Sequence, residues 1–465
     1  MYIIVHKSFK YFILANDIIG EEMLLKKLKI SLNPYQMYSL VNREHSHSFL
    51  LESMEGDEKL ARFSFIGFGP SKMVSAKGKT VDVDGQEEDA EDPIRALAKE
   101  IPKHEVDMEG FVGGAVGYFS YDYVRQIERL PESGKPDTKF PDFEFGIFED
   151  CLVYDHRDRS VSYLSHGEDR SQHLLELAKE DVFMGPFQAG KAKSDMDEEE
   201  YVAAVSAAKE KIADGEIFQA VLSRRYVFPY EGDLLKFYNV LKQTNPSPYM
   251  YYLNFGERKI IGSSPENLVR VEGRKVESSA TLAGTRPRGG TPQEDKRLEE
   301  ELKGDEKERA EHLMLVDLTR NDIGKVSKFS SVSVPEFMKV HKYSHVQHLG
   351  SHVAGELAEG KDCFDAFNAL FPAGTLTGAP KARAMEVIEE LERSRRGPYG
   401  GAIGYFSFNR NCDFAITIRT LFAHRQKAYV QAGAGIVYDS VPEKEYQETE
   451  NKMRALMDAL GVVGE

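Results

Sequence analysis

Short runs in which hydrophobic and polar residues alternate fill the first third of the chain. Between residues 30 and 165 they include HSFLLESM, ARFSFIGFGP and SVSYLSH, and turn residues separate one run from the next. A period of two places successive side chains on opposite faces of a strand. The pattern therefore predicts a strand-rich region.

A helical pattern begins after Asp197. Acidic residues occupy the first turn of DEEEYVAAVSAAKEKIADGEI, apolar residues then recur with a helical period, and Gly215 follows them. Farther on, the strand-like runs KIIGSSPENLVRV and KAYVQAGAGIVYD alternate with helices that we expect at residues 305–320, 380–392 and 443–459. This mixture predicts a layered α+β fold.

The polar stretch 185–201 interrupts both patterns and is rich in Gly, Lys and Asp, as linkers are. A chain of 465 residues is long enough for two or three domains. We expect an N-terminal extension of uncertain structure at 1–22, an N-terminal domain at 23–184, a linker at 185–197 and a C-terminal domain at 198–465.

One segment occurs twice. GGAVGYFSYD at residues 113–122 and GGAIGYFSFN at residues 400–409 differ at few positions. Aromatic strands draw on few residue types, but ten aligned positions favour a common origin over chance. We expect a duplicated half-domain whose related sheets pack on each other.

Composition narrows the function classes. The chain has 60 basic and 76 acidic side chains and a formal charge of −16, which argues against nucleic acid and membrane surfaces as partners. No apolar run approaches the roughly 18 residues of a membrane span, and YFILA at 11–15 is too short for a signal peptide. The isolated Cys151, Cys363 and Cys412 predict free thiols in a reducing cytoplasm.

Two pairs of glutamates have the same spacing. Glu308 and Glu311 lie on one expected helix, and Glu445 and Glu448 lie on another. A spacing of three places both carboxylates of a pair on one helix face. Two such faces can bind Mg²⁺ through two carboxylates, with the other two acids beside them. The alternative is that these acids are solvated and only complement the helix dipole.

Two loops are suited to bind an anion. The run Gly433, Ala434, Gly435 ends a strand and leaves backbone N–H groups bare, although a simple bulge or turn has the same pattern. The loop FPAGTLTG leads into a helix near Pro380, where Lys381 can meet an anion or simply face solvent.

Six long motifs, in order, resemble those of the chorismate-utilising enzymes, and most closely the branch that makes anthranilate. They are LAGTRPRG (282–289), EHLMLVDLTRND (311–322), HVQHLGSHVAGEL (345–357), FPAGTLTGAPKARAM (371–385), YGGAIGYFSF (399–408) and QAGAGIVYDSVPEKEYQETENK (431–452). The resemblance covers about 195–455 fully and 40–150 more loosely. It implies a duplicated α+β sandwich of antiparallel sheets and helices, with the catalytic domain at 198–465.

The resemblance also implies the roles of individual residues. Mg²⁺ would be held by Glu311 and Glu448, with Glu308 and Glu445 completing the acidic cluster. Chorismate would contact Gly284, Thr285, Tyr399, Arg419, Gly433, Ala434 and Gly435. Because chorismate is a dianion entering an acidic protein, Arg419, Mg²⁺ and bare N–H groups must reverse the field locally.

The implied reaction adds ammonia at ring C2 with loss of the C4 hydroxyl and then eliminates pyruvate. Glu266 matches the acid that protonates the leaving hydroxyl, and His348 matches the residue tied to the elimination. Each can instead be an ordinary buried side chain. The remaining implied catalytic residues are Gln219, Thr375 and Lys381.

Two positions separate the sister activities. Aminodeoxychorismate synthases carry a nucleophilic lysine where this chain has Ala283, and isochorismate synthases carry a lysine base where it has Gln219. Ammonia is therefore the favoured nucleophile. The alternatives are aminodeoxychorismate synthase component I, isochorismate synthase and a non-catalytic tryptophan-sensing scaffold, and the retained acids and His348 argue against the scaffold.

A partner and an inhibitor complete the expectations. No cysteine lies in the G-x-C-x-G turn of a glutaminase, so we expect a separate glutamine amidotransferase subunit, assembled as a heterotetramer. Tryptophan is the expected feedback inhibitor. By resemblance, its pocket includes Ser53, Pro248, Tyr249 and Met250.

Overall fold

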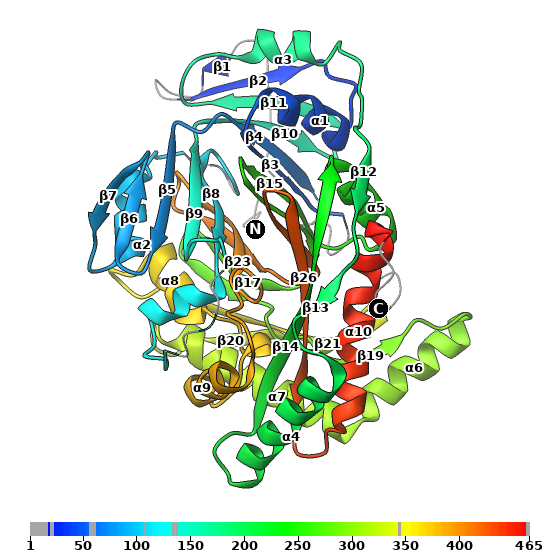
Figure 1. The fold of residues 1–465 in the computed structure, drawn as a ribbon. Coiled ribbons are helices and arrows are strands. Elements are labelled where there is room, and N and C mark those ends of the chain that lie inside the picture. The colour runs from blue at the N-terminus through cyan, green and yellow to red at the C-terminus, as the bar shows by residue number, and fades with distance from the viewer. Residues whose placement is uncertain are drawn as a thin grey trace.

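Two large antiparallel sheets and the helices around them form the protein (Figure 1). This computed structural model describes residues 17–18, 23–54, 62–106, 108, 110–132, 135, 138–342 and 346–461. Most of the expected extension at 1–22 lies outside the described residues.

The first sheet runs in the order β1 (Asp17–Ile18), β2 (Leu24–Leu28), β11 (Ser160–Ser165), β10 (Asp150–Asp155), β4 (Phe63–Phe68), β3 (His47–Glu52), β15 (Tyr249–Phe255), β16 (Arg258–Ser264), β25 (Thr420–His424), β26 (Lys427–Ile436), β14 (Gln219–Gly232) and β12 (Phe187–Ala189), with β13 (Lys193–Ser194) and β22 (Gly378–Ala379) also paired to β14. The second runs in the order β19 (Ala283–Pro287), β21 (Val346–Glu356), β18 (Lys275–Ser278), β17 (Asn267–Glu272), β24 (Cys412–Ile416), β23 (Ala402–Ser407), β8 (Gly114–Phe119), β9 (Phe143–Phe148), β5 (Lys72–Lys77), β6 (Thr80–Val83) and β7 (Gln86–Asp89), with β20 (Ser333–Lys342) paired to β21.

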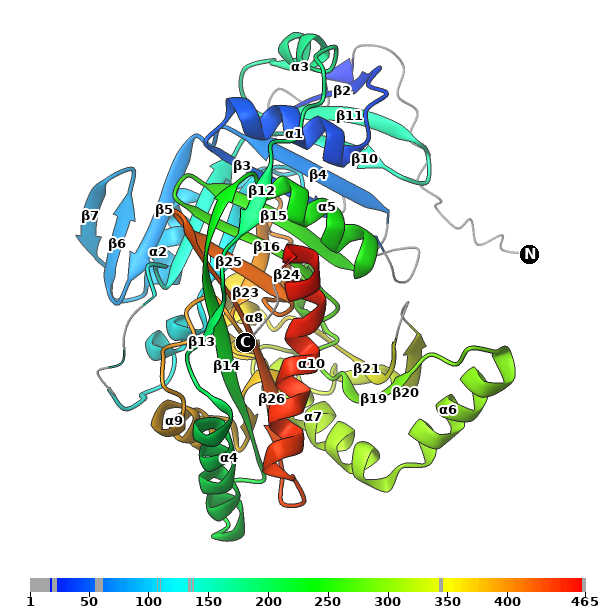
Figure 2. The same cartoon turned by 45° about the vertical axis from the view of Figure 1, so that its right-hand side comes forward.

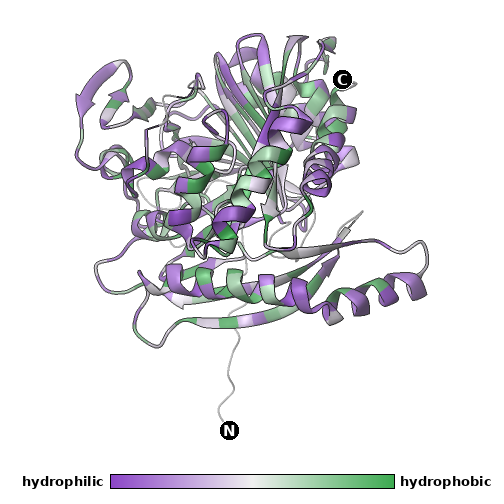
Figure 3. Ribbon diagram, turned by 60° about the horizontal axis from the view of Figure 1, so that its bottom comes forward, coloured by the Kyte–Doolittle hydropathy of each residue, from purple (hydrophilic) through white to green (hydrophobic). Residues whose placement is uncertain are grey.

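Figure 3 shows hydrophilic and hydrophobic residues following one another along the helices. They are α1 (Pro34–Glu44), α2 (Pro93–Glu100), α3 (Ser171–Leu177), α4 (Glu198–Ala213), α5 (Leu235–Thr244), α6 (Pro292–Gly304), α7 (Glu306–Gly324), α8 (Cys363–Leu370), α9 (Lys381–Leu391) and α10 (Pro442–Leu460), with short 3₁₀ turns η1 (Tyr121–Gln126) and η2 (Gly374–Leu376). Among them, none is long and apolar enough to cross a membrane.

Local sequence signals explain where the predicted helices begin. Asp197 caps α4 by accepting the backbone N–H of Glu200, whose side chain accepts the N–H of Asp197 in return. Pro442 opens α10, where a missing N–H costs nothing. The helices expected at 305–320, 380–392 and 443–459 are confirmed as α7, α9 and α10.

The repeated segments are neighbours in one sheet. β8 and β23 pair antiparallel, with Gly117 opposite Gly404, the equivalent position of the other copy. The two copies of the repeated segment are thus related by a local two-fold axis. The expectation that the copies belong to different sheets packed on each other was wrong, because each half contributes strands to both sheets.

Both faces of the first sheet are buried. Phe49 and Tyr251 join the main hydrophobic core, which also contains residues of the second sheet, whereas their chain neighbours Leu50 and Tyr252 join another core with residues of α1, α5 and α10. This alternation is the period of two seen in the sequence. The expected linker contains β12 and β13, which pair with β14, and the division into domains stays a prediction. All three cysteines are buried and free.

Candidate active site

The two glutamate pairs come from helices that pack on different sheets, α10 on the first and α7 on the second. α10 packs against β26 and α4, and α7 packs against β19 and β21 (Figure 2). Their first two turns carry Glu308 and Glu311 on α7 and Glu445 and Glu448 on α10. The helices thus present the acids expected from the sequence to one site.

The electrostatics show that the four carboxyl groups are close. Burial raises the pKa of Glu311, and the charges of Glu308 and Glu448 raise it further. Burial likewise raises the pKa of Glu445, with Glu448 adding to the effect. Mutual repulsion of this kind favours a bound cation, so oxygen donors and charge both fit Mg²⁺.

Gln219 lies directly beside this cluster. Its Nε2 donates a hydrogen bond to Oε1 of Glu311 at 2.9 Å, and its buried Oε1 has no partner among the described residues. A Cβ at Gly435 would lie 2.7 Å from Gln219 Nε2, which is too close. Glycine at position 435 is therefore what allows the Gln219 side chain to reach Glu311.

The run Gly433 to Gly435 ends a strand, as expected, because it lies in the last four residues of β26. β14 pairs with β26 as far as Ile436, whereas β25 pairs only as far as Val430. The last residues of β26 therefore form an open edge on the β25 side. There the Gly433 N–H lies against the Tyr399 hydroxyl, and the Gly433 carbonyl accepts a hydrogen bond from another side chain, Lys452, at 2.9 Å.

Glu266 is the most strongly perturbed acid of the site. Burial raises its pKa to about 7, although Thr375, the Leu282 N–H, Arg419 and Lys452 each lower it in part. Its Oε1 and the Oγ1 of Thr375 are both buried without a hydrogen-bond partner among the described residues. Such buried, unpartnered atoms are what a site for a polar ligand presents in the absence of the ligand.

His348 is neutral near pH 7. Burial lowers its pKa to about 4, and the nearby charges of Arg419 and Lys452 contribute. Its Nδ1 lies 3.0 Å from the carbonyl oxygen of Gly284. A carbonyl can only accept, so Nδ1 carries the proton and Nε2 holds the lone pair. His348 is thus prepared to accept a proton and not to donate one.

A left-handed backbone conformation marks two of the expected substrate contacts, and it is strained only at the non-glycine Arg419. Arg419 has a φ of 50°, and Gly284 has a φ of 67°. A Cβ at Gly284 would also meet the Glu308 carboxylate at 2.9 Å. Non-glycine residues in the left-handed region cluster at functional sites. Arg419 lies near both Glu266 and His348, because its charge lowers the pKa of each.

Lys381 lies apart from the rest. Its Nζ pairs with Asp322 at 2.5 Å, and burial lowers its pKa. Asp322 lies eleven residues beyond Glu311 on α7, which is about 16 Å along a helix. The structure therefore brings Lys381 to the far end of α7 and not to the four glutamates.

Lys452 belongs to the site, and the sequence analysis missed it. Its Nζ pairs with Glu448 at 2.6 Å, besides binding Gly433, and its charge lowers the pKa of Glu266 and His348. The available signal was its position four residues after Glu448 on a predicted helix, a spacing typical of ion pairs.

The residues expected to bind the inhibitor also meet. β3 and β15 pair with Met250 opposite Glu52, and the Met54 N–H donates to the Ser247 carbonyl at 3.3 Å. Between them, the buried Oγ of Ser53 has no hydrogen-bond partner among the described residues. Pro248 directly precedes β15, and Tyr249 is the first residue of that strand. The Tyr249 hydroxyl donates a hydrogen bond to Asp413 at 3.0 Å.

Comparison with known proteins places this geometry in a family. Residues 46–458 match the family described as chorismate binding enzyme. The chain belongs to this family. The expected fold class is confirmed with it, since chorismate binding enzymes of known structure share the two sheets and their helices.

Individual members of the family are also similar to the chain over most of its length. The anthranilate synthase component 1 of Thermococcus kodakarensis is 48% identical over 95% of this chain and 100% of that protein. That of Methanothermobacter marburgensis is 48% identical over 93% of this chain and 94% of its own length.

Two solved structures of the family extend the comparison. Anthranilate synthase component I from Streptococcus pneumoniae has a TM-score of 0.76 and 37% identity, covering 87% of this chain and 93% of that one. A menaquinone-specific isochorismate synthase from Escherichia coli has a TM-score of 0.73, with 94% of each chain covered, and at 19% identity shows the fold alone.

Proposed function

We propose that this chorismate binding enzyme converts chorismate and ammonia into anthranilate and pyruvate. The observation that carries the proposal is Gln219, whose amide is held by Glu311 where a water-activating lysine would stand in an isochorismate synthase. Position 283 is alanine and offers no nucleophile either. Ammonia from outside the chain is then the nucleophile, as in the anthranilate synthases to which the chain is similar.

Glu266 is the proposed acid of the first step. Ammonia attacks ring C2 while the C4 hydroxyl leaves, and hydroxide is a poor leaving group unless it is protonated. With a pKa of about 7, Glu266 holds a proton at neutral pH and can release it. The Thr375 side chain lies beside Glu266, whose pKa it lowers, and its hydroxyl would orient the substrate.

His348 is the proposed base of the second step. Removal of the proton at C2 and breakage of the bond from C3 to the ether oxygen release pyruvate and leave an aromatic ring. A neutral imidazole with its lone pair on Nε2 can take that proton. The bond from Nδ1 to the Gly284 carbonyl sets the tautomer.

The anionic groups of chorismate need positive partners. Arg419, Lys452 and the open edge of β26 at Gly433 supply them within the chain. We propose that Glu311 and Glu448 hold Mg²⁺, with Glu308 and Glu445 beside them. When bound, Mg²⁺ would neutralise a substrate carboxylate next to the acidic cluster.

The nitrogen source provides the test. Near neutral pH ammonia is mostly ammonium, which is not nucleophilic, so we propose that a separate glutamine amidotransferase subunit delivers it, in a heterotetramer. The purified chain should make anthranilate from chorismate with ammonium salts at raised pH and none with glutamine, as followed by anthranilate fluorescence. Adding the amidotransferase should restore glutamine use.

Two results would refute this proposal. One is glutamine-dependent activity of the rigorously purified single chain, since Cys151, Cys363 and Cys412 are all buried. The other is isochorismate as the main product. A non-catalytic scaffold is excluded by any turnover that depends on Glu266.

We also propose that tryptophan inhibits the enzyme by binding in a pocket beside Ser53, where β3 ends next to the start of β15. Replacing Ser53 by phenylalanine should fill this pocket and raise the tryptophan concentration needed for half inhibition by more than about tenfold, as loss of a buried polar contact costs 1 to 3 kcal/mol. Activity without tryptophan should persist. Inhibition curves for Ser53→Phe and for the control Ser46→Phe, before β3, are compared, and equal curves would contradict the pocket.

A further inference from the structure

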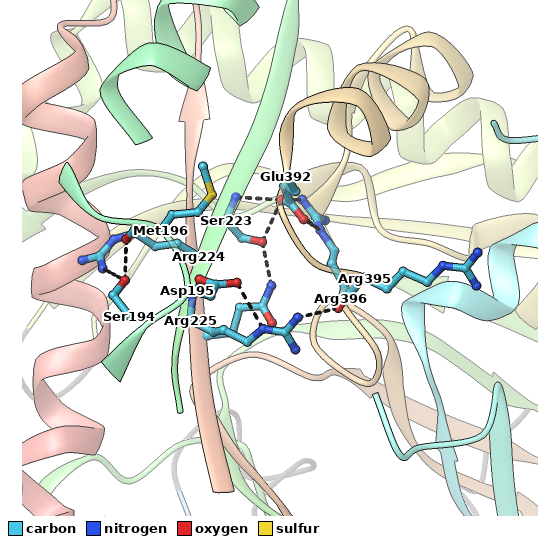
Figure 4. Close-up of polar contacts among 10 residues, drawn as sticks. Ser194, Asp195, Met196, Ser223, Arg224, Arg225, Glu392, Arg395 and Arg396 are labelled. Atoms are coloured by element: carbon cyan, nitrogen blue, oxygen red, sulfur yellow. Dashed lines mark hydrogen bonds and ion pairs between the residues drawn. The ribbon is translucent and has the colours of Figure 1, made fainter. Parts of the chain in front are cut away.

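A buried ion pair connects the segments that carry the proposed chorismate contacts. Arg396 and Glu392 have side chains only 1% and 4% exposed, and Nη2 of Arg396 lies 2.6 Å from Oε1 of Glu392 (Figure 4). They lie after α9, in a stretch that the sequence analysis did not single out. A buried ion pair seldom adds net stability, so its value has to be sought in the geometry that it imposes.

The guanidinium group of Arg396 holds two backbone carbonyls. Nη1 donates to the Leu376 carbonyl and Nη2 to the Val221 carbonyl, each at 2.6 Å. Leu376 follows Thr375 in η2. Val221 lies two residues after Gln219 on β14, so both residues share a face of that strand. One planar group thus fixes the spacing between two segments that are remote in sequence.

Glu392 and the ring contacts extend the same network to the substrate edge. Oε1 of Glu392 accepts the N–H and the hydroxyl of Ser223, each at 2.7 Å, and Ser223 is the cross-strand partner of Gly433. The Arg396 guanidinium also lies 5.8 Å from the centre of the Tyr399 ring. The pair therefore contacts Tyr399 directly, and it also contacts neighbours of Thr375 and Gln219 in sequence and of Gly433 across the sheet.

We propose that Arg396 is a positioning residue that sets the distance between the Thr375 and Gln219 segments, with Glu392 fixing its orientation. The inference rests on the proposed function for its readout. The proposed role requires the planar guanidinium group of arginine and not merely a positive charge, because a lysine cannot donate to two carbonyls and a carboxylate in one plane.

Arg396→Lys tests the proposal against Arg225→Lys. Arg225 is also buried in this region. It pairs with Asp195 and donates to the Arg395 carbonyl, and neither of these partners is a proposed site residue (Figure 4). Arg396→Lys should lower kcat/KM for chorismate by roughly 100-fold, with part of the loss in KM, since small misplacements carry costs of this size. Arg225→Lys should change it less than about twofold.

A double-mutant cycle with Thr375→Val distinguishes positioning from general support of the fold. If Arg396 acts through the Thr375 segment, Thr375→Val should cost much less in the Arg396→Lys background than in the wild type. Additive losses would overturn the proposal. So would an unchanged kcat/KM in folded Arg396→Lys, with folding judged by urea unfolding.

Glu392→Gln keeps an oxygen acceptor for Ser223 but removes the charge that binds Arg396. This variant should therefore lower kcat/KM for chorismate, as Arg396→Lys does. If neither variant folds, Arg396 serves the fold and the proposal is rejected. If the wild type itself makes no anthranilate, the proposed function fails first, and chorismate binding to the variants still reports on the positioning.

Discussion

Glu311→Gln is expected to lower kcat/KM for chorismate by at least about 100-fold while the fold stays intact, because metal sites lose affinity when a ligand loses its charge. The variant removes one anion from a cluster whose members repel one another, as the raised pKa of Glu311 shows. No buried charge is left unpaired, so the metal-free protein should not lose stability. Activity is measured over a Mg²⁺ titration, and the shift of the unfolding midpoint with Mg²⁺ gives a second readout.

Glu306→Gln is the matched control for this prediction. Glu306 is an exposed residue in the first turn of the same helix, outside the acidic cluster. Its replacement should leave the Mg²⁺ dependence unchanged, whereas Glu448→Gln should behave like Glu311→Gln. Full activity of either site variant at limiting Mg²⁺ would show that the metal assignment is wrong.

Glu266→Gln should lower kcat by roughly 10²- to 10⁴-fold, the usual contribution of a general acid. The amide fills the same space but has no acidic proton for the leaving hydroxyl. In the wild type, kcat should decline above pH 7 as the acid ionises. A variant with wild-type kcat would exclude Glu266 as the acid.

The same variant should be more stable than the wild type above neutral pH. The folded-state pKa of Glu266 is raised from 4.5 to about 7, so its protonated form stabilises the fold fully below 4.5, and this contribution is lost as the pH rises through 7. Glutamine cannot ionise. Relative to the wild type, Glu266→Gln should therefore gain up to about 3 kcal/mol between pH 4.5 and 8.

Urea unfolding at pH 5 and pH 8 measures this gain. Glu272→Gln, at an exposed position on the neighbouring strand β17, is the control and should show no such pH dependence. An equal free-energy difference between Glu266→Gln and the wild type at both pH values would mean that Glu266 is not protonated in the folded protein at neutrality.

Features with a local cause were predictable from the sequence. The helices α4, α7 and α10 follow from caps, proline and apolar periodicity, and the acids at Glu311 and Glu448 follow from spacing along those helices. The repeated segment indicated a duplication because its two copies align over ten residues. What the pattern does not contain is the pairing partner, so the adjacency of Gly117 and Gly404 had to come from the structure.

Properties that depend on long-range contacts were not predictable. Lys381 follows a loop of anion-binding type, but Asp322 from another helix neutralises it. The lowered pKa of His348 results from burial and from the charges of Arg419 and Lys452, both far away in sequence. Arg396 looked like one basic residue among several in a polar turn, and only its burial against Glu392 distinguishes it.

The joint between β3 and β15 has a consequence for regulation. This joint is a continuous ladder of main-chain hydrogen bonds, with Tyr251 opposite Leu51 on one side and Gly262 on the other. A ligand bound against Ser53, as we propose for tryptophan, would therefore displace a strand whose next neighbour, β16, ends two residues before Glu266. The proposed inhibition would then need no rotation of one rigid body against another, because a small shear within a single sheet would move the proposed acid away from the substrate.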